Sequence, residues 1–189
     1  SAIEALRAMK LLIQQEVRRK GMSENIKLGA GGIREIEFIA QAFQLIHGGR
    51  DLSLQQRPLL KVLTTLEGQG YLPPAVVAEM KEGYEFLRYT EHALQGIGDR
   101  QTQMLPADAQ DQARVAAIMG FADWSSFHER LMHWRGRIEW HFQQVIADPD
   151  EDEAQAGETA VGAEWLPLWQ GALDDEAAVL QLQEAGFVE

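Results

Sequence analysis

One short segment has residue types and spacing that suit phosphate binding. Lys27-Leu-Gly-Ala-Gly-Gly-Ile-Arg-Glu-Ile-Glu-Phe38 places three glycines directly before a predicted helix. Glycines let the backbone turn tightly, and a helix N-terminus carries N–H groups and partial positive charge. Arg34, in the first turn of that helix, adds a guanidinium that binds anions through paired hydrogen bonds. The pattern also fits a plain connecting loop, because it matches neither the dinucleotide fingerprint nor the P-loop and no predicted strand precedes it.

Other groups of ionisable residues have the spacing of ordinary helix surfaces. His128, His133 and His141 fall on one predicted helix at separations of five and eight residues, which do not bring them to one metal ion. Arg88 and Glu91 have the spacing of a helix ion pair. No serine, histidine and aspartate are spaced as a nucleophile with its base. We therefore expect no metal site and no catalytic residue among these groups.

The elements that position these residues are predicted to be helices, because apolar side chains recur at steps of three and four. Six are expected, over residues 2–20, a segment containing 36–46, 54–68, 73–97, 108–119 and 124–145. Pro74 opens one and Gly120 ends another, which are favourable places for these residues. No segment has the alternation of a strand. The sequence predicts an all-α fold, a helical bundle of about six helices with a short C-terminal helical extension.

The helix predicted after Asp123 has the most regular apolar pattern. Asp123 is a favourable N-cap residue, and large apolar side chains then line one face of the helix. This face consists of Trp124, Phe127, Leu131, Trp134, Ile138, Phe142 and Val145. We expect it to be a core seam of the bundle, so that packing rather than a ligand explains Trp124 and Trp134.

The net charge of −12 is unevenly distributed and divides the chain. Twelve of the 29 acidic residues lie in 148–189, where there is no Lys or Arg. Residues 1–147 therefore contain 17 acidic and 17 basic residues and have no net charge. We predict a bundle over 1–147, an acidic linker over 148–163 and the start of another helical region over 164–189. A body without basic excess is not expected to bind nucleic acid. The short apolar runs predict no membrane contact, and the lack of cysteine favours a cytoplasmic location.

Several segments, in the same order along the chain, resemble bacterial glutamine synthetase adenylyltransferases in the region that follows a nucleotidyltransferase domain. The most specific resemblance is in Asn25-Ile-Lys-Leu-Gly-Ala-Gly-Gly-Ile-Arg-Glu-Ile-Glu-Phe-Ile39. The others are Gln44–Arg50, Phe86–Arg88, Glu91–Gln95, Asp99–Pro106 and Met119–Trp124, with a looser resemblance at Trp165–Trp169. A similar helical module follows the catalytic domain of the PII uridylyltransferase.

This resemblance implies a parent enzyme that regulates nitrogen assimilation and has two nucleotidyltransferase halves. One half attaches AMP from ATP to a tyrosine of glutamine synthetase, and the other removes it by phosphorolysis, giving ADP. The acidic linker followed by Trp165-Leu-Pro-Leu-Trp169 resembles the deadenylylating half. Glutamine synthetase, the PII signal protein and the chain's own nucleotidyltransferase domain are the implied partners. Magnesium and ATP, ADP or phosphate are implied for the parent, with none bound by this segment alone.

The family's magnesium-binding Gly-Ser loop and Asp-x-Asp pair are absent, because Asp-x-Asp occurs only within the acidic run 148–152. We therefore expect no catalytic residue and no activity in this segment alone. The resemblance implies that seven residues adjoin the active site of the neighbouring domain: Lys27, Gly29, Gly31, Gly32, Arg34, Glu35 and Glu37. They either lie beside nucleotide or phosphate or form interdomain ion pairs, and both interpretations stay open. The alternative is a stand-alone, non-catalytic helical protein-interaction module.

Overall fold

The structure, a computed structural model, describes residues 15, 17, 19, 21–98 and 102–146. The elements are α2 (Ile33–His47), the 3-10 helix η1 (Leu52–Leu54), α3 (Leu59–Gly68), α4 (Pro74–Gly98), α5 (Ala109–Ile118) and α6 (Trp124–Ile146). Within these ranges there is no strand, and an isolated antiparallel bridge joins Asn25 to Met104. The predicted all-α class is confirmed. The predicted helix over 2–20 lies almost wholly outside the described residues, as do the linker 148–163 and the extension 164–189.

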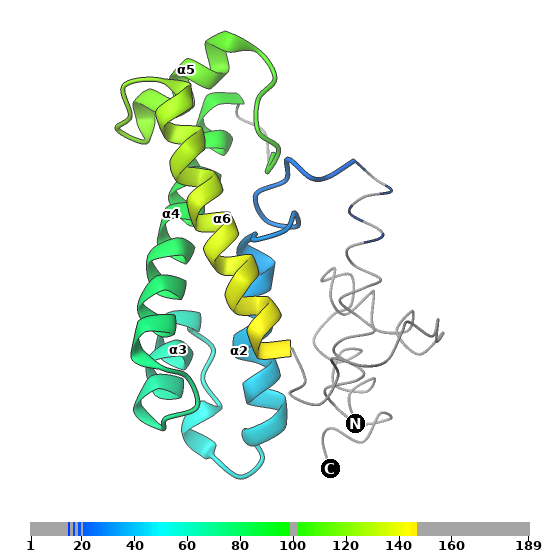
Figure 1. Cartoon of the computed structure of the whole chain (residues 1–189), viewed down its shortest axis with the longest axis vertical. Helices are drawn as coiled ribbons and strands as arrows, with labels where there is room; N and C mark the ends of the chain where they lie inside the picture. The colour runs from blue at the N-terminus through cyan, green and yellow to red at the C-terminus, as the bar shows by residue number, and fades with distance from the viewer. Residues whose placement is uncertain (1–14, 16, 18, 20, 99–101, 147–189) are drawn as a thin grey trace.

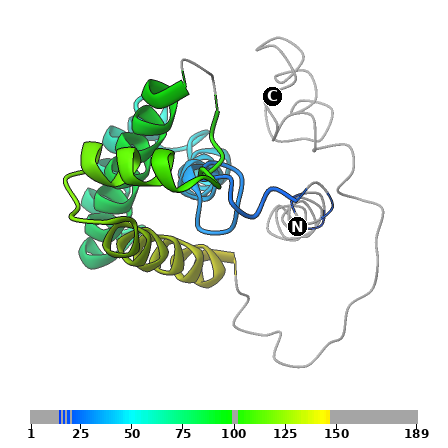
Figure 2. The same ribbon diagram turned by 90° about the horizontal axis from the view of Figure 1, so that it is seen from above.

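The two longest helices, α4 and α6, pack side by side and run in opposite directions (Figure 1). Helix α2 packs on both of them, and α3 packs on α4 and α2. Helix α5 lies at the end of the bundle opposite α3, where it contacts α4 and α6 (Figure 1). Figure 2 shows the same bundle from above. In the part of the chain that the structure describes, no helix is both long and apolar enough to cross a bilayer.

Helix α6 contributes the core seam that its periodicity predicts. Phe127, Leu131 and Ile138 are fully or almost fully buried, and Trp134 and Phe142 are nearly so. The Asp123 carboxylate accepts a hydrogen bond from the N–H of Ser126 at 2.8 Å, which confirms the predicted N-cap. That bond also lowers the pKa of Asp123. The opposing core surface comes mainly from α2 and α4, so the seam fixes α6 against both helices.

The predicted start of the third helix is wrong. α3 begins at Leu59, and residues 52–54 form the separate 3-10 helix η1. Pro58 explains the difference, because a proline disfavours the helical conformation at the residue before it, here Arg57. The side-chain amide of Gln44, from α2, donates to the carbonyls of Leu54 and Gln56 at 2.6 and 2.8 Å. These bonds satisfy backbone carbonyls of the irregular segment that replaces the expected helical turn.

A polar cluster joins α4 to α6 at the surface. Arg137 Nε donates to Glu79 Oε2 at 2.6 Å, and the nearly buried His141 places its Nε2 2.7 Å from the same oxygen. The hydrogen bond from Arg137, followed by that from His141, holds the pKa of Glu79 below its ordinary value. The ionised form of Glu79 is therefore favoured in the native state.

We expect Phe127→Ala to lower the free energy of unfolding by about 3–5 kcal/mol, because it removes a fully buried ring and leaves a cavity. Met132→Ala is the control on the same helix, since Met132 is exposed and should change stability far less. Urea denaturation of both variants measures the difference. Equal effects would show that the seam is not the core of the bundle.

The lowered pKa of Glu79 predicts a pH-dependent effect of Glu79→Gln. The ionised carboxylate stabilises the native state above the pKa of the unfolded chain, near 4.5, and this contribution is lost as the pH falls through the lower native pKa. At pH 7 we expect a loss of roughly 0.2–1 kcal/mol, the usual range for a partly exposed pair. The difference between the unfolding midpoints of parent and variant should shrink as the pH falls below 4.5; a constant difference would contradict the assignment.

Candidate functional site

The glycine-rich segment forms a compact loop that begins at Asn25. The nearly buried Asn25 side chain accepts hydrogen bonds from the N–H groups of Lys27 and Leu28, both at 2.9 Å. The N–H of Gly29 donates to the carbonyl of Asn25 at 2.8 Å. An asparagine that bonds the backbone two residues on is a common way to stabilise a turn. The loop is therefore held by its own polar groups.

The glycine N–H groups of this loop are used inside the protein. Gly31 donates to the carboxylate of Glu35 at 3.0 Å, and Gly32 donates to the carbonyl of Gly29 at 3.0 Å. At the start of α2, Ile33, Arg34 and Glu35 donate to the carbonyls of Ile26, Lys27 and Gly32. The backbone N–H groups of Gly29, Gly31 and Gly32 therefore already have hydrogen-bond partners within the protein. A phosphate at this loop would depend on the Lys27 and Arg34 side chains.

Glu35 and Glu37, for which the sequence left the same two interpretations open, lie in different surroundings. Glu35 is buried in the first turn of α2 and reaches back to Gly31, as the acid of a capping box reaches back to the chain before its helix. Glu37 pairs with Arg34 at 3.1 Å, and their side chains are 23% and 21% exposed. Glu35 therefore maintains the loop, whereas Arg34 and Glu37 lie at the surface.

Arg135 of α6 binds the other side of the loop. Its Nε donates to the carbonyl of Ala30 and its Nη2 to the carbonyl of Ser23, both at 2.8 Å. Arg135 is nearly buried, and this burial lowers the pKa of its guanidinium. Three acidic side chains oppose that shift by stabilising the cation: Glu24, Glu35 and Glu139. The loop region thus provides hydrogen-bond acceptors for a buried arginine, and acids before the loop, on α2 and on α6 provide negative charge.

Two of the glycines are explained by the closeness of α6. Gly31 has φ +65°, and a Cβ added there would overlap the backbone carbonyl of Arg135. A Cβ at Gly29 would overlap the Arg135 guanidinium and the carbonyl of Asn25. Glycine is therefore required at both positions so that the loop and α6 can touch. This is a packing reason for residues whose spacing also suited phosphate binding.

A second set of contacts ties the loop to α4. The N–H of Ile26 donates to the carbonyl of Gln103 at 2.9 Å, and the Gln103 side chain donates to Glu91 Oε1 at 3.1 Å. Arg88 donates to the other oxygen of Glu91 at 2.6 Å. The Glu91 side chain is 5% exposed, so this carboxylate is buried between two donors. The predicted helix pair Arg88–Glu91 is thus also a link between α4 and the loop.

Tyr84 lies on α4, beside Arg88 of the same helix. Its ring lies 5.9 Å from the Arg88 guanidinium. Burial raises the pKa of Tyr84; the Arg88 charge opposes the shift, and the charges of Glu37 and Glu91 add to it. Glu37 is therefore close enough to act on a residue of α4. We call the set formed by Arg34, Glu37, Tyr84, Arg88 and Glu91 the α2–α4 polar surface; Glu91 is its buried member.

The sequence prediction missed Arg135 and the role of Gln103. Arg135 follows Trp134 of the apolar seam and lies four residues after Leu131, so its position borders the buried face. A charged residue at the border of a buried helix face was the sequence signal that could have indicated a buried arginine with partners inside the protein. The histidines of α6 do not gather around a metal: among the described residues, no three potential ligands do. His141 contacts Glu79 instead.

We expect Gly31→Ala to destabilise the protein more than Gly120→Ala. Both glycines have positive φ, but a Cβ at Gly120 meets nothing within 4 Å, whereas one at Gly31 meets Arg135. Gly120→Ala measures the cost of the backbone conformation, about 1–2 kcal/mol, and the overlap should add roughly 1–3 kcal/mol for Gly31→Ala. Thermal unfolding compares the two variants. Equal losses would mean that the approach of α6 does not constrain the loop.

Comparison with known proteins places this loop in a wider family. The family model described as GlnD PII-uridylyltransferase matches residues 7–146. A bifunctional glutamine synthetase adenylyltransferase/adenylyl-removing enzyme of Pseudomonas putida is 79% identical over 99% of this chain and 19% of its own length. Enzymes with the same name in Pseudomonas aeruginosa and Hahella chejuensis are 77% and 50% identical, over 100% and 96% of the chain and 19% of their own lengths.

The chain thus spans about a fifth of the length of these relatives. The family match covers the loop and every helix of the described bundle. The resemblance seen in the sequence is confirmed over nearly the whole chain, as a resemblance to one part of a longer enzyme. The chain therefore belongs to the GlnD PII-uridylyltransferase family and corresponds to a segment of the bifunctional glutamine synthetase adenylyltransferases.

Proposed function

We propose that this chain is the helical segment beside the deadenylylating nucleotidyltransferase domain of a bifunctional glutamine synthetase adenylyltransferase. In this proposal the parent enzyme removes AMP from a tyrosine of glutamine synthetase by phosphorolysis, giving ADP, and so regulates nitrogen assimilation. The segment contributes an edge of that active site, formed by Lys27–Glu37 and the α2–α4 polar surface. The supporting observation is a partly exposed Arg34–Glu37 pair in the first turns of α2, directly after a loop that buried contacts hold in place.

The local structure supports an edge that is ordered before any ligand arrives. The buried Arg135 donates to the carbonyls of Ala30 and Ser23 at 2.8 Å. The buried Glu91 acts on the other side through Gln103, which donates to it at 3.1 Å and whose carbonyl accepts from Ile26. A site works best when buried partners fix its functional side chains in one geometry. Arg34 and Glu37 then present a cation and a carboxylate at the surface. Such a pair suits either a phosphate or a complementary charged protein surface.

The chain's own residues fit an anion better than a metal ion. Lys27 and Arg34 are cationic and suit phosphate by charge. In contrast, the described residues include no group of three potential metal ligands. We therefore assign magnesium, and the chemistry of ATP, ADP or phosphate transfer, to the neighbouring domain and derive no step through the metal. Within the proposal, glutamine synthetase is the substrate, and the PII signal protein and a cytoplasmic location stay predictions from sequence.

The relatives support a segment of an enzyme over a stand-alone interaction module. In each relative compared here the matching region is about a fifth of the protein. Each of these relatives is named as an enzyme that adds and removes adenylyl groups. A helical region within such a chain lies next to catalytic domains, so contact with them is its most direct role.

In the full-length enzyme, we expect Arg34→Ala to slow phosphorolysis of adenylylated glutamine synthetase at least tenfold, equivalent to about 1.4 kcal/mol in the barrier. The reason is that Arg34 provides the partly exposed cation of the proposed edge. The measurement is ADP release against phosphate concentration. A raised KM for phosphate indicates contact with the anion, and a lowered kcat at unchanged KM indicates positioning of the domain.

Arg114→Ala is a matched control, because Arg114 also pairs with an acid three residues away on a helix but is 54% exposed on α5. It should leave turnover unchanged. Full activity of Arg34→Ala with normal folding would reduce the loop to a packing role. Loss of AMP attachment with intact removal would assign the segment to the other half of the enzyme.

A further inference from the structure

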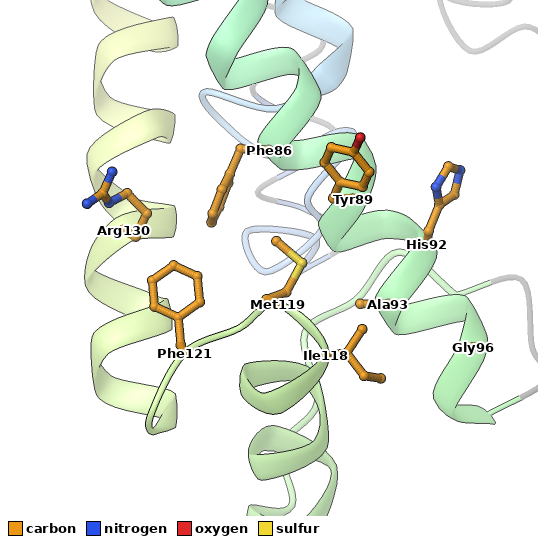
Figure 3. A pocket seen from close by; sticks show the side chains of 9 residues that line it. All are labelled: Phe86, Tyr89, His92, Ala93, Gly96, Ile118, Met119, Phe121 and Arg130. Carbon is orange, nitrogen blue, oxygen red and sulfur yellow. The ribbon is translucent and has the colours of Figure 1, made fainter.

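An apolar groove lies on a different face of α4 from the polar surface. It has a volume of about 610 Å³ and runs between α4, the turn after α5 and the first part of α6 (Figure 3). Phe86, Met119 and Phe121 form apolar walls, and His92 and Arg130 also line it. Its α4 residues follow the sequence Phe86, Tyr89, Ala93 and Gly96, at helical steps of three and four. The polar surface uses the separate series Tyr84, Arg88 and Glu91 of the same helix, so both surfaces can be occupied at once.

The groove exposes apolar side chains that a partner would cover. Ile118 is 59% exposed and Tyr89 is 66% exposed, although both line this one concave surface. Clustered exposure of this kind marks a binding surface more often than scattered apolar residues do. The ionisable groups among the described lining residues are Tyr89, His92 and Arg130, with no carboxylate. The occupant should therefore be apolar, with acidic flanks.

We propose that the groove binds the chain's own segment Trp165-Leu-Pro-Leu-Trp169. This segment has four large apolar side chains in five residues, and Glu164 precedes it. Asp174 and Asp175 follow shortly after it. The region 148–189 as a whole contains twelve acidic residues and no Lys or Arg. Apolar side chains for the groove walls and acids for Arg130 thus occur together in one short stretch.

The length of the intervening chain matches the distance it has to cover. Arg130 lies 16 residues before the end of α6 at Ile146, which corresponds to about 24 Å along the helix axis. Residues 147–164 comprise 18 residues, and a chain of that length without secondary structure has a root-mean-square span of about 21–25 Å. The effective concentration of a tethered segment is highest when its linker length matches the span. A modest affinity is then sufficient for binding.

Hydrogen exchange of the 189-residue chain tests this proposal directly. Amides of residues 165–169 should exchange at least tenfold more slowly than in a free peptide of residues 160–175. Ile118→Glu should abolish most of this protection, because it places a carboxylate in the groove opposite acidic flanks. Ile118 is largely exposed, so the bundle should remain folded, and circular dichroism checks this.

Ile46→Glu is the matched control, since Ile46 is an exposed isoleucine outside the groove. It should leave the protection unchanged. Arg130→Glu should weaken protection at least threefold, whereas Arg114→Glu should not. Absence of protection, or protection that persists in Ile118→Glu, would overturn the proposal. Protection that grows with protein concentration would also overturn it, because a second copy would then be the occupant.

Discussion

The hydrogen bonds from the buried Arg135 guanidinium to two carbonyls of the glycine-rich loop constrain the rest of the site. A buried cation is costly unless hydrogen bonds and opposite charges surround it, and here Ala30, Ser23 and nearby acids supply both. The buried core seam of α6 fixes the position of the helix, and this in turn fixes the position of the Arg135 backbone. The backbone from Ser23 to Ala30 must then adopt a conformation in which both carbonyls can accept a hydrogen bond from Arg135. That shape determines where α2 starts and where Arg34 lies.

The same region is held from the side of α4 by a buried carboxylate. The Glu91 carboxylate accepts hydrogen bonds from Arg88 and Gln103, and the Gln103 carbonyl accepts one from the N–H of Ile26 at the start of the loop. The loop therefore lies between an arginine of α6 and an acid of α4. Neither of these residues has to touch a ligand to matter for function. Their effect is to remove conformational freedom from the charged pair at the surface, which is the physical basis for an ordered active-site edge.

The helices could be predicted because their signals are local. Asp123 and the seam of α6 lie within one helix, and Pro74 and Gly120 mark ends through backbone preferences of single residues. The start of α3 was missed where a proline acts on the residue before it. Arg135 was missed because its partner Ala30 lies 105 residues away, and helical periodicity carries no information about contacts at that distance. The glycines illustrate the same limit. Their spacing suits phosphate binding, whereas the atoms that approach Gly29 and Gly31 in the structure belong to Arg135 and the loop backbone.

In the proposed enzyme, Arg34, Glu37 and the nearby α4 residues form an edge that a neighbouring catalytic domain completes. A crystal structure of a longer stretch of the parent enzyme, containing the preceding catalytic domain, tests it most directly. We expect the α2–α4 polar surface to become buried against that domain near its nucleotide site, with the contacts of Arg135 unchanged. A domain that packs elsewhere and leaves Arg34 and Glu37 facing solvent would contradict it.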